Sequence, residues 1–556
     1  MSVPSDRPSG NDRPAPSGGR PGREAFGGRF SGAVTGGVPI RVREPILFDA
    51  DAAAPADPPA AQAPPQQALR PPAAPWGPLP AGPGRQGPER SAPAEPTIPF
   101  PGEATGSAPQ AAPPSRRRAR RLPDEQELRE RVSGLAARRE RVLAPVYRLR
   151  SPGEPLEFVR GEGAYLYDAR GRQYLDAEGG AAVVGHSNPL VRERVRTALD
   201  RVSIHTGHVD EQLVSYAERL VHMFPHELDR VLFACSGSEA VDLSLRIVRY
   251  RTRRRGVLCT SGANHGITSA CASISPALGD RSAVDDAVVA VPAPDGLRED
   301  PATVGRAFAQ RVRAGIAELG RRGHAFAGLI CDPVFFSDGV QADPPGFLQE
   351  ARQAVREAGG LWISDEAQAG FGRIGSHWWG YQRHGLDPDL VVLGRGMANS
   401  LPAAAVVGRA DLFERFGAEV PYFSGMGGGT ASIAAATAVL DVLKGDALRE
   451  LTRRAGRVLA GGLVEIAEAH ERIAQVRGAG LVLGLQIAGG RGGSASPART
   501  AEALVRAMRR RGVLLSLTGP ERDVVAIRPP LVCTEQDMAM LLEAFEDALV
   551  ELRGDR

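Results

Sequence analysis

The segment Leu361–Ser364 is a short apolar run that ends in an acid pair, Asp365 and Glu366. A second apolar run, Leu390–Leu393, is followed closely by a base, Arg395. Short runs that are apolar throughout are typical of strands buried on both faces of a parallel sheet, and ligands of open α/β sheets lie at the carboxyl ends of such strands. We therefore expect the acid pair and Arg395 at the floor of a ligand site.

Strand-like and helix-like segments alternate through the rest of the chain. Strands are expected at 230–234, 256–260, 288–291, 327–331, 361–364, 390–393 and 403–407, and helices at 238–252, 303–319, 346–358 and 431–443. Further helical or strand-like pieces are 190–224, 446–470, 478–487, 498–511, 513–517, 524–528 and 535–552. This alternation predicts an α/β fold with a mostly parallel sheet covered on both faces, followed by a smaller α/β unit.

Residues 1–122 are rich in Pro, Ala, Gly, Ser and Arg, and we expect this tail to be disordered because it cannot bury enough apolar surface to offset its ordering entropy. Residues 38–48 are either a docking peptide or, as we favour, a chance apolar cluster. The arginine run 116–121 suits nucleic acid or a membrane surface, but we favour a solvated hinge before the folded part.

The bulk composition narrows the class of protein. At 556 residues the chain is too long for one hydrophobic core, so two or three units are expected. The net charge is only +3, which argues against a dedicated nucleic-acid binder. The five cysteines have no paired spacing, so we expect neither a metal site nor a disulfide framework. Because no signal core or run of about 18 apolar residues occurs, we expect a soluble, cytoplasmic protein without a membrane span.

Two patterns carry candidate ligand chemistry. Around Gly237 and Ser238 the chain passes from strand through a glycine turn into a helix, which suits a phosphate, although Ser236 over Glu239 is also an ordinary helix cap. Asp365 can hold the protonated nitrogen of a heterocycle, and Gln368 can hydrogen-bond a ring oxygen. The alternative for Asp365 is a structural carboxylate that caps the next turn.

Several motifs occur together in the order and spacing of one enzyme family. They are Gly185–Pro189, Ser236–Ala240, His265–Gly266, Asp365–Gln368, Gly372–Gly375 and Pro388–Gly394. Over about residues 130–552 the chain resembles the class III pyridoxal-phosphate (PLP) aminotransferases. His265–Ser269, Ile274–Pro276, Leu515–Pro520 and Arg528–Leu531 look closest to the branch of ethanolamine-phosphate phospho-lyases and alanine–glyoxylate aminotransferases.

The resemblance implies PLP fold type I, with a large sheet domain of the seven-stranded type and a small C-terminal α/β domain. It divides the chain into the tail 1–122, an N-terminal helix and strands of the small domain at 123–185, the large domain at 186–430, and an interdomain helix with the C-terminal small domain at 431–556. It also implies a dimer with sites at the interface, and a small amine or phosphorylated amine as substrate.

Site residues follow from the motif match. Gly237 and Ser238 would hold the cofactor phosphate, Asp365 the pyridine nitrogen and Gln368 the ring hydroxyl region. Asn264 and His265 take the positions beside the ring, where the family normally has an aromatic residue before His-Gly.

Departures from the family pattern bear directly on the chemistry. The Schiff-base lysine of the family falls at Arg395, the aromatic residue at Asn264, and the Thr-Phe-Gly-Gly pattern at Gly425–Gly428. The only lysine in the chain is Lys444. A guanidinium is neutral in roughly one molecule in a million at pH 7, so it cannot capture an aldehyde or shuttle a proton. It can bind an anion with two parallel hydrogen bonds.

Three hypotheses follow. The chain is a transaminase or amine phospho-lyase by ancestry, or it is a pseudoenzyme that acts as a ligand-binding or partner subunit of an active paralogue, or it is an enzyme that uses PLP or pyridoxamine phosphate non-covalently or has changed chemistry. The residues favour the second, and either a homodimer or a heterodimer with a related subunit fits it.

Overall fold

The computed structural model describes residues 124–149, 155–279, 285–444, 446–489 and 496–554. The predicted disordered tail, its apolar patch at 38–48 and its arginine run at 116–121 lie outside the described residues.

The largest sheet has seven strands in the order β4-β10-β9-β8-β7-β5-β6. Its strands are β4 (Arg230–Ala234), β5 (Gly256–Thr260), β6 (Val288–Val291), β7 (Phe326–Cys331), β8 (Leu361–Asp365), β9 (Leu390–Leu393) and β10 (Ala404–Gly408). Strand β10 runs antiparallel to both of its neighbours, and the pairs from β9 through to β6 are parallel. The predicted mostly parallel sheet is confirmed.

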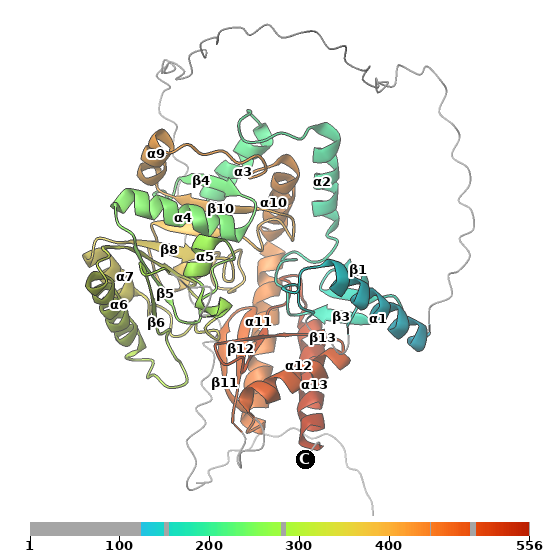
Figure 1. Ribbon diagram of the computed structural model, residues 1–556. Coiled ribbons are helices and arrows are strands. Elements are labelled where there is room, and N and C mark those ends of the chain that lie inside the picture. The colour runs from blue at the N-terminus through green and yellow to red at the C-terminus, as the bar shows by residue number, and fades with distance from the viewer. Residues whose placement is uncertain (1–123, 150–154, 280–284, 445, 490–495, 555–556) are drawn as a thin grey trace, which may run out of the picture. The chain divides into compact units, whose positions relative to one another are not determined.

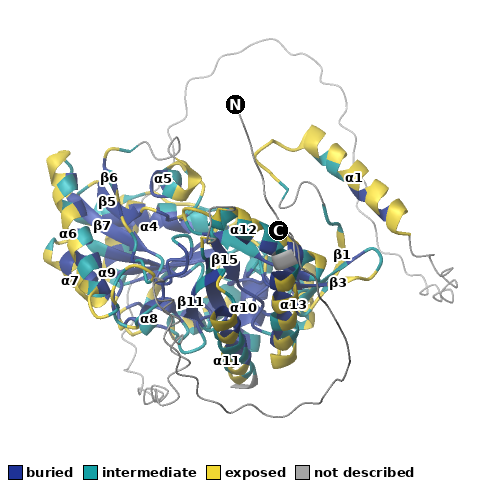
Figure 2. Ribbon diagram, turned by 90° about the horizontal axis from the view of Figure 1, so that it is seen from below, coloured by how far each residue is buried: buried dark blue, intermediate teal, exposed yellow. Residues whose placement is uncertain are grey.

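Helices cover both faces of this sheet (Figure 1). They include α4 (Gly237–Thr252), α5 (Ser269–Ser273), α6 (Val304–Arg321), α7 (Gln349–Glu357), α8 (Gly380–Arg383) and α9 (Ala410–Glu419), with a 3-10 turn at Pro276–Leu278. In β9, Leu390 and Val392 pack with α4 and α9, whereas Val391 and Leu393 belong to the core that includes α6 and α7. Because successive side chains point to opposite faces, a strand covered on both sides must be apolar throughout. Figure 2 shows β5 and β7 buried and α1 (Glu125–Val142) largely exposed.

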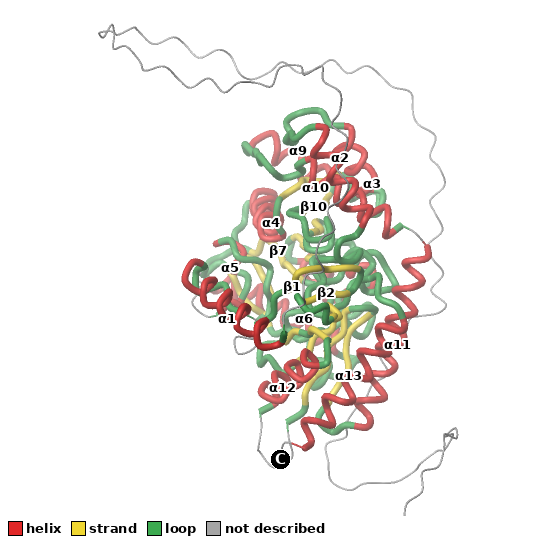
Figure 3. Tube along the Cα trace, turned by 90° about the vertical axis from the view of Figure 1, so that its right-hand side faces the viewer, coloured by secondary structure: helices red, strands yellow, loops and turns green. Residues whose placement is uncertain are grey.

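Two four-stranded sheets and the long helices α10 to α13 make up most of the C-terminal part of the described chain, and one of the sheets includes strands near its start. One sheet has the order β1-β2-β3-β13 and the other β11-β12-β15-β14. Their strands are β1 (Phe158–Glu162), β2 (Tyr165–Asp168), β3 (Gln173–Asp176), β11 (Ile473–Ala479), β12 (Val482–Ile487), β13 (Val513–Leu514), β14 (Ser516–Thr518) and β15 (Val524–Ile527). The helices are α10 (Thr430–Leu443), α11 (Asp446–Ala469), α12 (Pro497–Arg510) and α13 (Glu535–Gly554). Helices α11 and α13 lie side by side (Figure 3).

Three predicted pieces are wrong in detail. Residues 190–224 form two helices, α2 (Pro189–Arg201) and α3 (Glu211–Val221), because Asp210 caps a new helix after an irregular stretch. The piece 478–487 is instead the end of β11, a turn at Gly480 with φ +56, and β12. The expected strand 513–517 is divided between β13 and β14, which pair in different sheets.

We expect N188A to destabilise the fold by about 1 kcal/mol. The Asn188 side chain accepts hydrogen bonds from the amides of Leu190 and Val191 at the start of α2, and a proline occupies the first helical position. Alanine leaves these amides without that acceptor. Urea unfolding measures the change, and N188S, which keeps a capping oxygen, should recover most of the loss. An unchanged midpoint in N188A would contradict this assignment of the cap.

Candidate active site

Asp365 lies at the carboxyl end of β8 and is almost fully buried. Its Oδ2 accepts a hydrogen bond from Nδ1 of His265 at 2.7 Å, and its Oδ1 accepts one from the amide of Ala367 at 3.0 Å. The other ring nitrogen of His265, Nε2, is buried and has no hydrogen-bond partner among the described residues. A carboxylate oxygen accepts more than one hydrogen bond, so Asp365 keeps capacity for a protonated ring nitrogen.

Helix α4 begins directly after β4, with Ser236 as its N-cap. The hydroxyl of Ser236 accepts from the amide of Glu239, and the Glu239 carboxylate accepts from the amide of Cys235. The capping interpretation of this segment is therefore correct, and it leaves the amides of Gly237 and Ser238 without an intrahelical partner, as in any first turn. Such amides suit an anion, so the two interpretations are compatible.

The end of β9 approaches the same helix terminus. A Cβ atom built on Gly394 would lie 3.4 Å from the Cα atom of Gly237, so only a small residue allows this close approach. Arg395 follows directly, with a φ of +31 that side chains rarely adopt. Its exposed guanidinium donates to the carbonyl of Gly179 at 3.0 Å. Burial and the nearby charge of Arg395 lower the pKa of Arg373, in the glycine-flanked loop after β8, to about 10.

The Gln368 side chain is hydrogen-bonded to Arg528, through Nη1 of the guanidinium and Oε1 of the amide. Nη2 of Arg528 donates to the carbonyls of Glu178 and Gly179, so Arg395 and Arg528 share the Gly179 carbonyl. Sequence reasoning noted the Arg528–Leu531 motif but gave Arg528 no role, since nothing local links it to Gln368.

The two remaining predicted residues lie in the loop before α5. His265 is buried against Asp365, as described above, whereas Asn264 is exposed and its side-chain oxygen accepts from the amide of Gly266 at 3.3 Å. A Cβ atom on Gly266 would lie 2.5 Å from Oγ of Ser238, which brings this loop against the start of α4. The structure thus gathers the predicted residues at one edge of the large sheet.

Buried carboxyl groups surround the Asp365 strand end. Burial, together with the charge of Asp365, raises the pKa of Asp332 to about 7. Burial likewise raises the pKa of Glu366 to about 7, although Glu366 accepts hydrogen bonds from the amides of Gly380 and Tyr381. Both groups bind a proton more tightly in the folded chain than in the unfolded one.

The raised pKa of Asp332 has a predictable effect on the stability of the fold. Since the folded-state pKa of Asp332 lies above its ordinary value of 3.8, its contribution to stability is lost as the pH rises from about 4 to about 7. We expect the free energy of unfolding of D332N, relative to that of the unchanged chain, to rise by about 1 kcal/mol or more between about pH 5 and 7. Urea titrations over this range measure it, with D200N, at a largely exposed carboxylate, as the control. Parallel pH profiles for D332N and the unchanged chain would refute the assignment.

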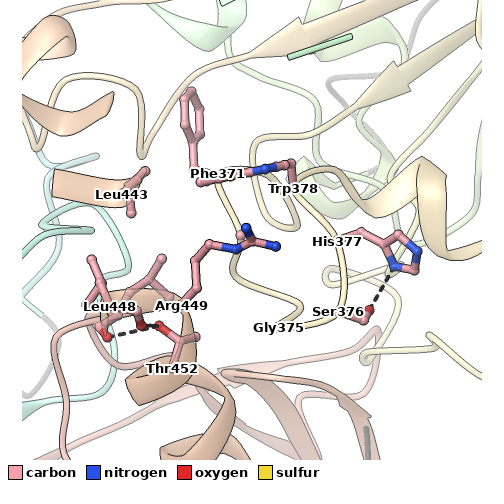
Figure 4. Close-up of a pocket in the computed structure, with 11 residues that line it drawn as sticks. Phe371, Gly375, Ser376, His377, Trp378, Leu443, Leu448, Arg449 and Thr452 are labelled. Carbon is pink, nitrogen blue, oxygen red and sulfur yellow. Dashed lines mark hydrogen bonds between the residues drawn. The ribbon is translucent and has the colours of Figure 1, made fainter. Parts of the chain in front are cut away.

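Two tryptophans and one cysteine have structural surroundings. Trp379 is fully buried and stacks on Phe224, with ring centroids 4.5 Å apart, so it serves packing. Trp378 lines a small pocket between the loop after Phe371 and helices α10 and α11. Figure 4 shows the side chain of Arg449 extending toward Trp378. Cys331 is buried and burial raises the pKa of its thiol well above the ordinary range, which disfavours a nucleophile there.

Two further findings concern the described residues only. No group of three His, Cys, Asp or Glu side chains within them is arranged to hold a metal ion. No helix in the described part of the chain is long and apolar enough to cross a membrane.

The residues present match the chemical groups of PLP in part. The first-turn amides of α4, which have no intrahelical partner, suit a phosphate, and the buried carboxylate of Asp365 suits a protonated pyridine nitrogen. A nucleophilic amine is what the described strand ends lack. The residue after Gly394 is an arginine, and the only lysine, Lys444, caps the far end of α10 and is exposed.

Comparison with known proteins identifies the family. The model of class III aminotransferases matches residues 149–549. An alanine–glyoxylate aminotransferase 2-like protein of Drosophila melanogaster is 32% identical over 72% of this chain and 84% of its own length. An ethanolamine-phosphate phospho-lyase homolog of Caenorhabditis elegans is 31% identical over 71% of this chain and 89% of its own. The structure of an Arthrobacter phospholyase in complex with phosphoethanolamine is 37% identical, with a TM-score of 0.72, and covers 75% of this chain and 99% of that one. The chain therefore belongs to the class III aminotransferases, a family with the PLP fold-type I architecture and pyridoxal phosphate as its cofactor.

Proposed function

We propose that this chain binds PLP without capturing it covalently, and that it acts as a ligand-binding or partner subunit rather than as a transaminase. The observation that carries the proposal is the position of Arg395. Arg395 comes two residues after the end of β9, the strand next to the one that ends in Asp365. The residue before it, Gly394, lies against Gly237, the first residue of α4. By motif match Arg395 takes the position of the family's Schiff-base lysine.

Residues of the strand ends would hold the cofactor. The amides of Gly237 and Ser238 would bind its phosphate, and the charge of Asp365 would keep its ring nitrogen protonated. Asn264 and His265 would lie beside the ring, with His265 orienting the Asp365 carboxylate through the 2.7 Å hydrogen bond. Bound PLP supplies an electron-withdrawing ring, which stabilises negative charge on a substrate carbon.

Arg395 favours an anionic ligand instead of covalent chemistry. Three guanidinium groups, those of Arg373, Arg395 and Arg528, donate to carbonyls of the segment 178–180. Such a concentration of positive charge favours a phosphate or carboxylate group on the ligand. A phosphorylated amine fits both this charge and the phosphoethanolamine complex of the Arthrobacter relative.

An active enzyme is the second candidate. The relatives are named aminotransferase and phospho-lyase, and they give the ancestry of the chain. Turnover would then require PLP or pyridoxamine phosphate held without a covalent bond, or another chemistry. Asn264, exposed where the family has an aromatic residue, favours the first candidate.

Titration of the purified chain with PLP, followed by borohydride reduction and peptide mapping, tests the proposal. We expect reversible binding that dialysis removes, with no stoichiometric covalent adduct, and K444R should behave identically because Lys444 is the only lysine. A stoichiometric adduct on any residue, or conversion of an amino donor to its ketone at ordinary enzymatic rates, would overturn it.

We extend the proposal to the assembly. Class III enzymes are typically dimers, and we propose either a homodimer or a heterodimer with a related, active subunit. The division at residues 122, 185 and 430 and a cytoplasmic location remain predictions.

A further inference from the structure

Arg528 is held more firmly than a surface arginine. It follows β15, is 5% exposed, and its backbone amide donates to the carbonyl of Ala177 at 2.7 Å. Its Nη2 donates to the carbonyls of Glu178 at 2.9 Å and Gly179 at 3.1 Å. Its guanidinium carbon also lies 4.4 Å from the centre of the Phe336 ring. The two carbonyls and the aromatic ring together fix the plane of the guanidinium.

A glycine makes room for this arrangement. A Cβ atom on Gly180 would lie 2.5 Å from Nε of Arg528, and φ at Gly180 is +64. Because of the close approach and the positive φ, any residue other than glycine would be strained at this position. The segment 178–180 is therefore shaped around the arginine side chain.

The fixed guanidinium decides which way the amide of Gln368 points. Arginine carries only donors, so Nη1 must face the oxygen of the Gln368 amide and not its nitrogen. The nitrogen, Nε2, has no hydrogen-bond partner among the described residues, and the side chain is partly exposed. Gln368 thus has its oxygen occupied and two N–H groups left to donate, three residues beyond Asp365.

We infer that Arg528 is a positioning residue, which orients Gln368 so that the site presents an N–H donor, and not an acceptor, to the ring oxygen of a ligand bound at the end of β8. The inference rests on the proposed binding of PLP. A donor at this position favours an ionised ring hydroxyl, because a charged acceptor makes the stronger hydrogen bond. Arg528 would therefore set ligand specificity and the ionisation of the ligand without touching it.

The experiment compares PLP with its analogue that lacks the ring hydroxyl, by equilibrium titration of the full chain. We expect the unchanged chain to prefer PLP by about 10-fold or more. R528M releases the Gln368 amide, so the preference should fall to within about 3-fold. Q368E keeps a partner for Arg528 but turns an oxygen toward the ligand, so the preference should vanish or reverse.

A second contact between a buried arginine and a glutamine, that of Arg477 with Gln486, serves as the control. Arg477 is 6% exposed, and its Nη2 donates to Oε1 of Gln486 at 2.9 Å. R477M removes a buried arginine from an equivalent contact, so it should lower stability without changing the preference for PLP. The absorbance of bound PLP against pH adds a second reading. The ring hydroxyl should ionise at higher pH in R528M and Q368E than in R477M or the unchanged chain.

Each outcome decides between the two proposals. If the unchanged chain binds PLP but does not prefer it over the analogue, or if R528M keeps both the preference and the pH profile, the role of Arg528 is refuted and the proposed function stands. If the unchanged chain binds neither compound, both proposals fail. Loss of preference in R477M as well would reduce Arg528 to a general structural role and would also overturn the inference.

Discussion

R395K is expected to make this chain form a borohydride-reducible, near-stoichiometric adduct with PLP, where the unchanged chain forms none. The reason is the basicity of the two side chains. The introduced amine is neutral in roughly one molecule in a thousand at neutral pH even without burial, against about one in a million for a guanidine. With an amine able to move a proton, conversion of an amino donor should also rise by about 100-fold or more.

The variant is best made in a K444R background, so that the introduced amine is the only lysine in the chain. R373K is the matched control. Arg373 is close enough to Arg395 for the charge of one to lower the pKa of the other, but it is buried and donates to the carbonyls of Leu481 and Pro529. We expect no adduct from R373K. Reversible binding of PLP without an adduct in R395K would show that Arg395 does not stand at the aldehyde, and would remove the main support for the proposed function.

D365N is expected to weaken the binding of PLP by about 10- to 100-fold. A hydrogen bond between charged groups contributes about 1.5–3 kcal/mol, and the asparagine keeps the size of the side chain while losing the charge that a protonated ring nitrogen requires. Equilibrium titration monitored by absorbance measures the change. Circular dichroism spectra of the variant and the unchanged chain establish that the fold is retained.

D338N is the matched control for D365N. Asp338 is also a buried carboxyl near the same strand ends, but its oxygens accept from the hydroxyl of Thr260 and the amide of Gly262. We expect its substitution to change PLP affinity by less than about 3-fold, at a cost in stability of about 1–3 kcal/mol. Equal losses of affinity in both variants would mean that the ligand responds to the general field of the buried carboxyls, and not to Asp365.

The sequence determined the layers of this protein. Runs such as Leu390–Leu393 are apolar at every position, as a strand covered on both faces requires, so the mostly parallel sheet and the edge that carries the candidate site follow from the alternating pattern. The same reasoning placed Asp365 at a buried strand end and Gly237 at a helix start. The ends of helices such as α4, α10 and α12 were predicted to within a few residues, since caps and glycines are local signals, but the break between α2 and α3 was not.

Only the tertiary structure decided what holds the site together. Arg528 reaches Gln368, and both Arg395 and Arg528 reach the carbonyl of Gly179, across segments that are far apart in the chain. Local periodicity reports burial and secondary structure, and it carries no information on which distant carbonyl or amide a buried guanidinium will meet. The division of 513–517 between two sheets was missed for the same reason, because strand partners are chosen by packing between distant segments.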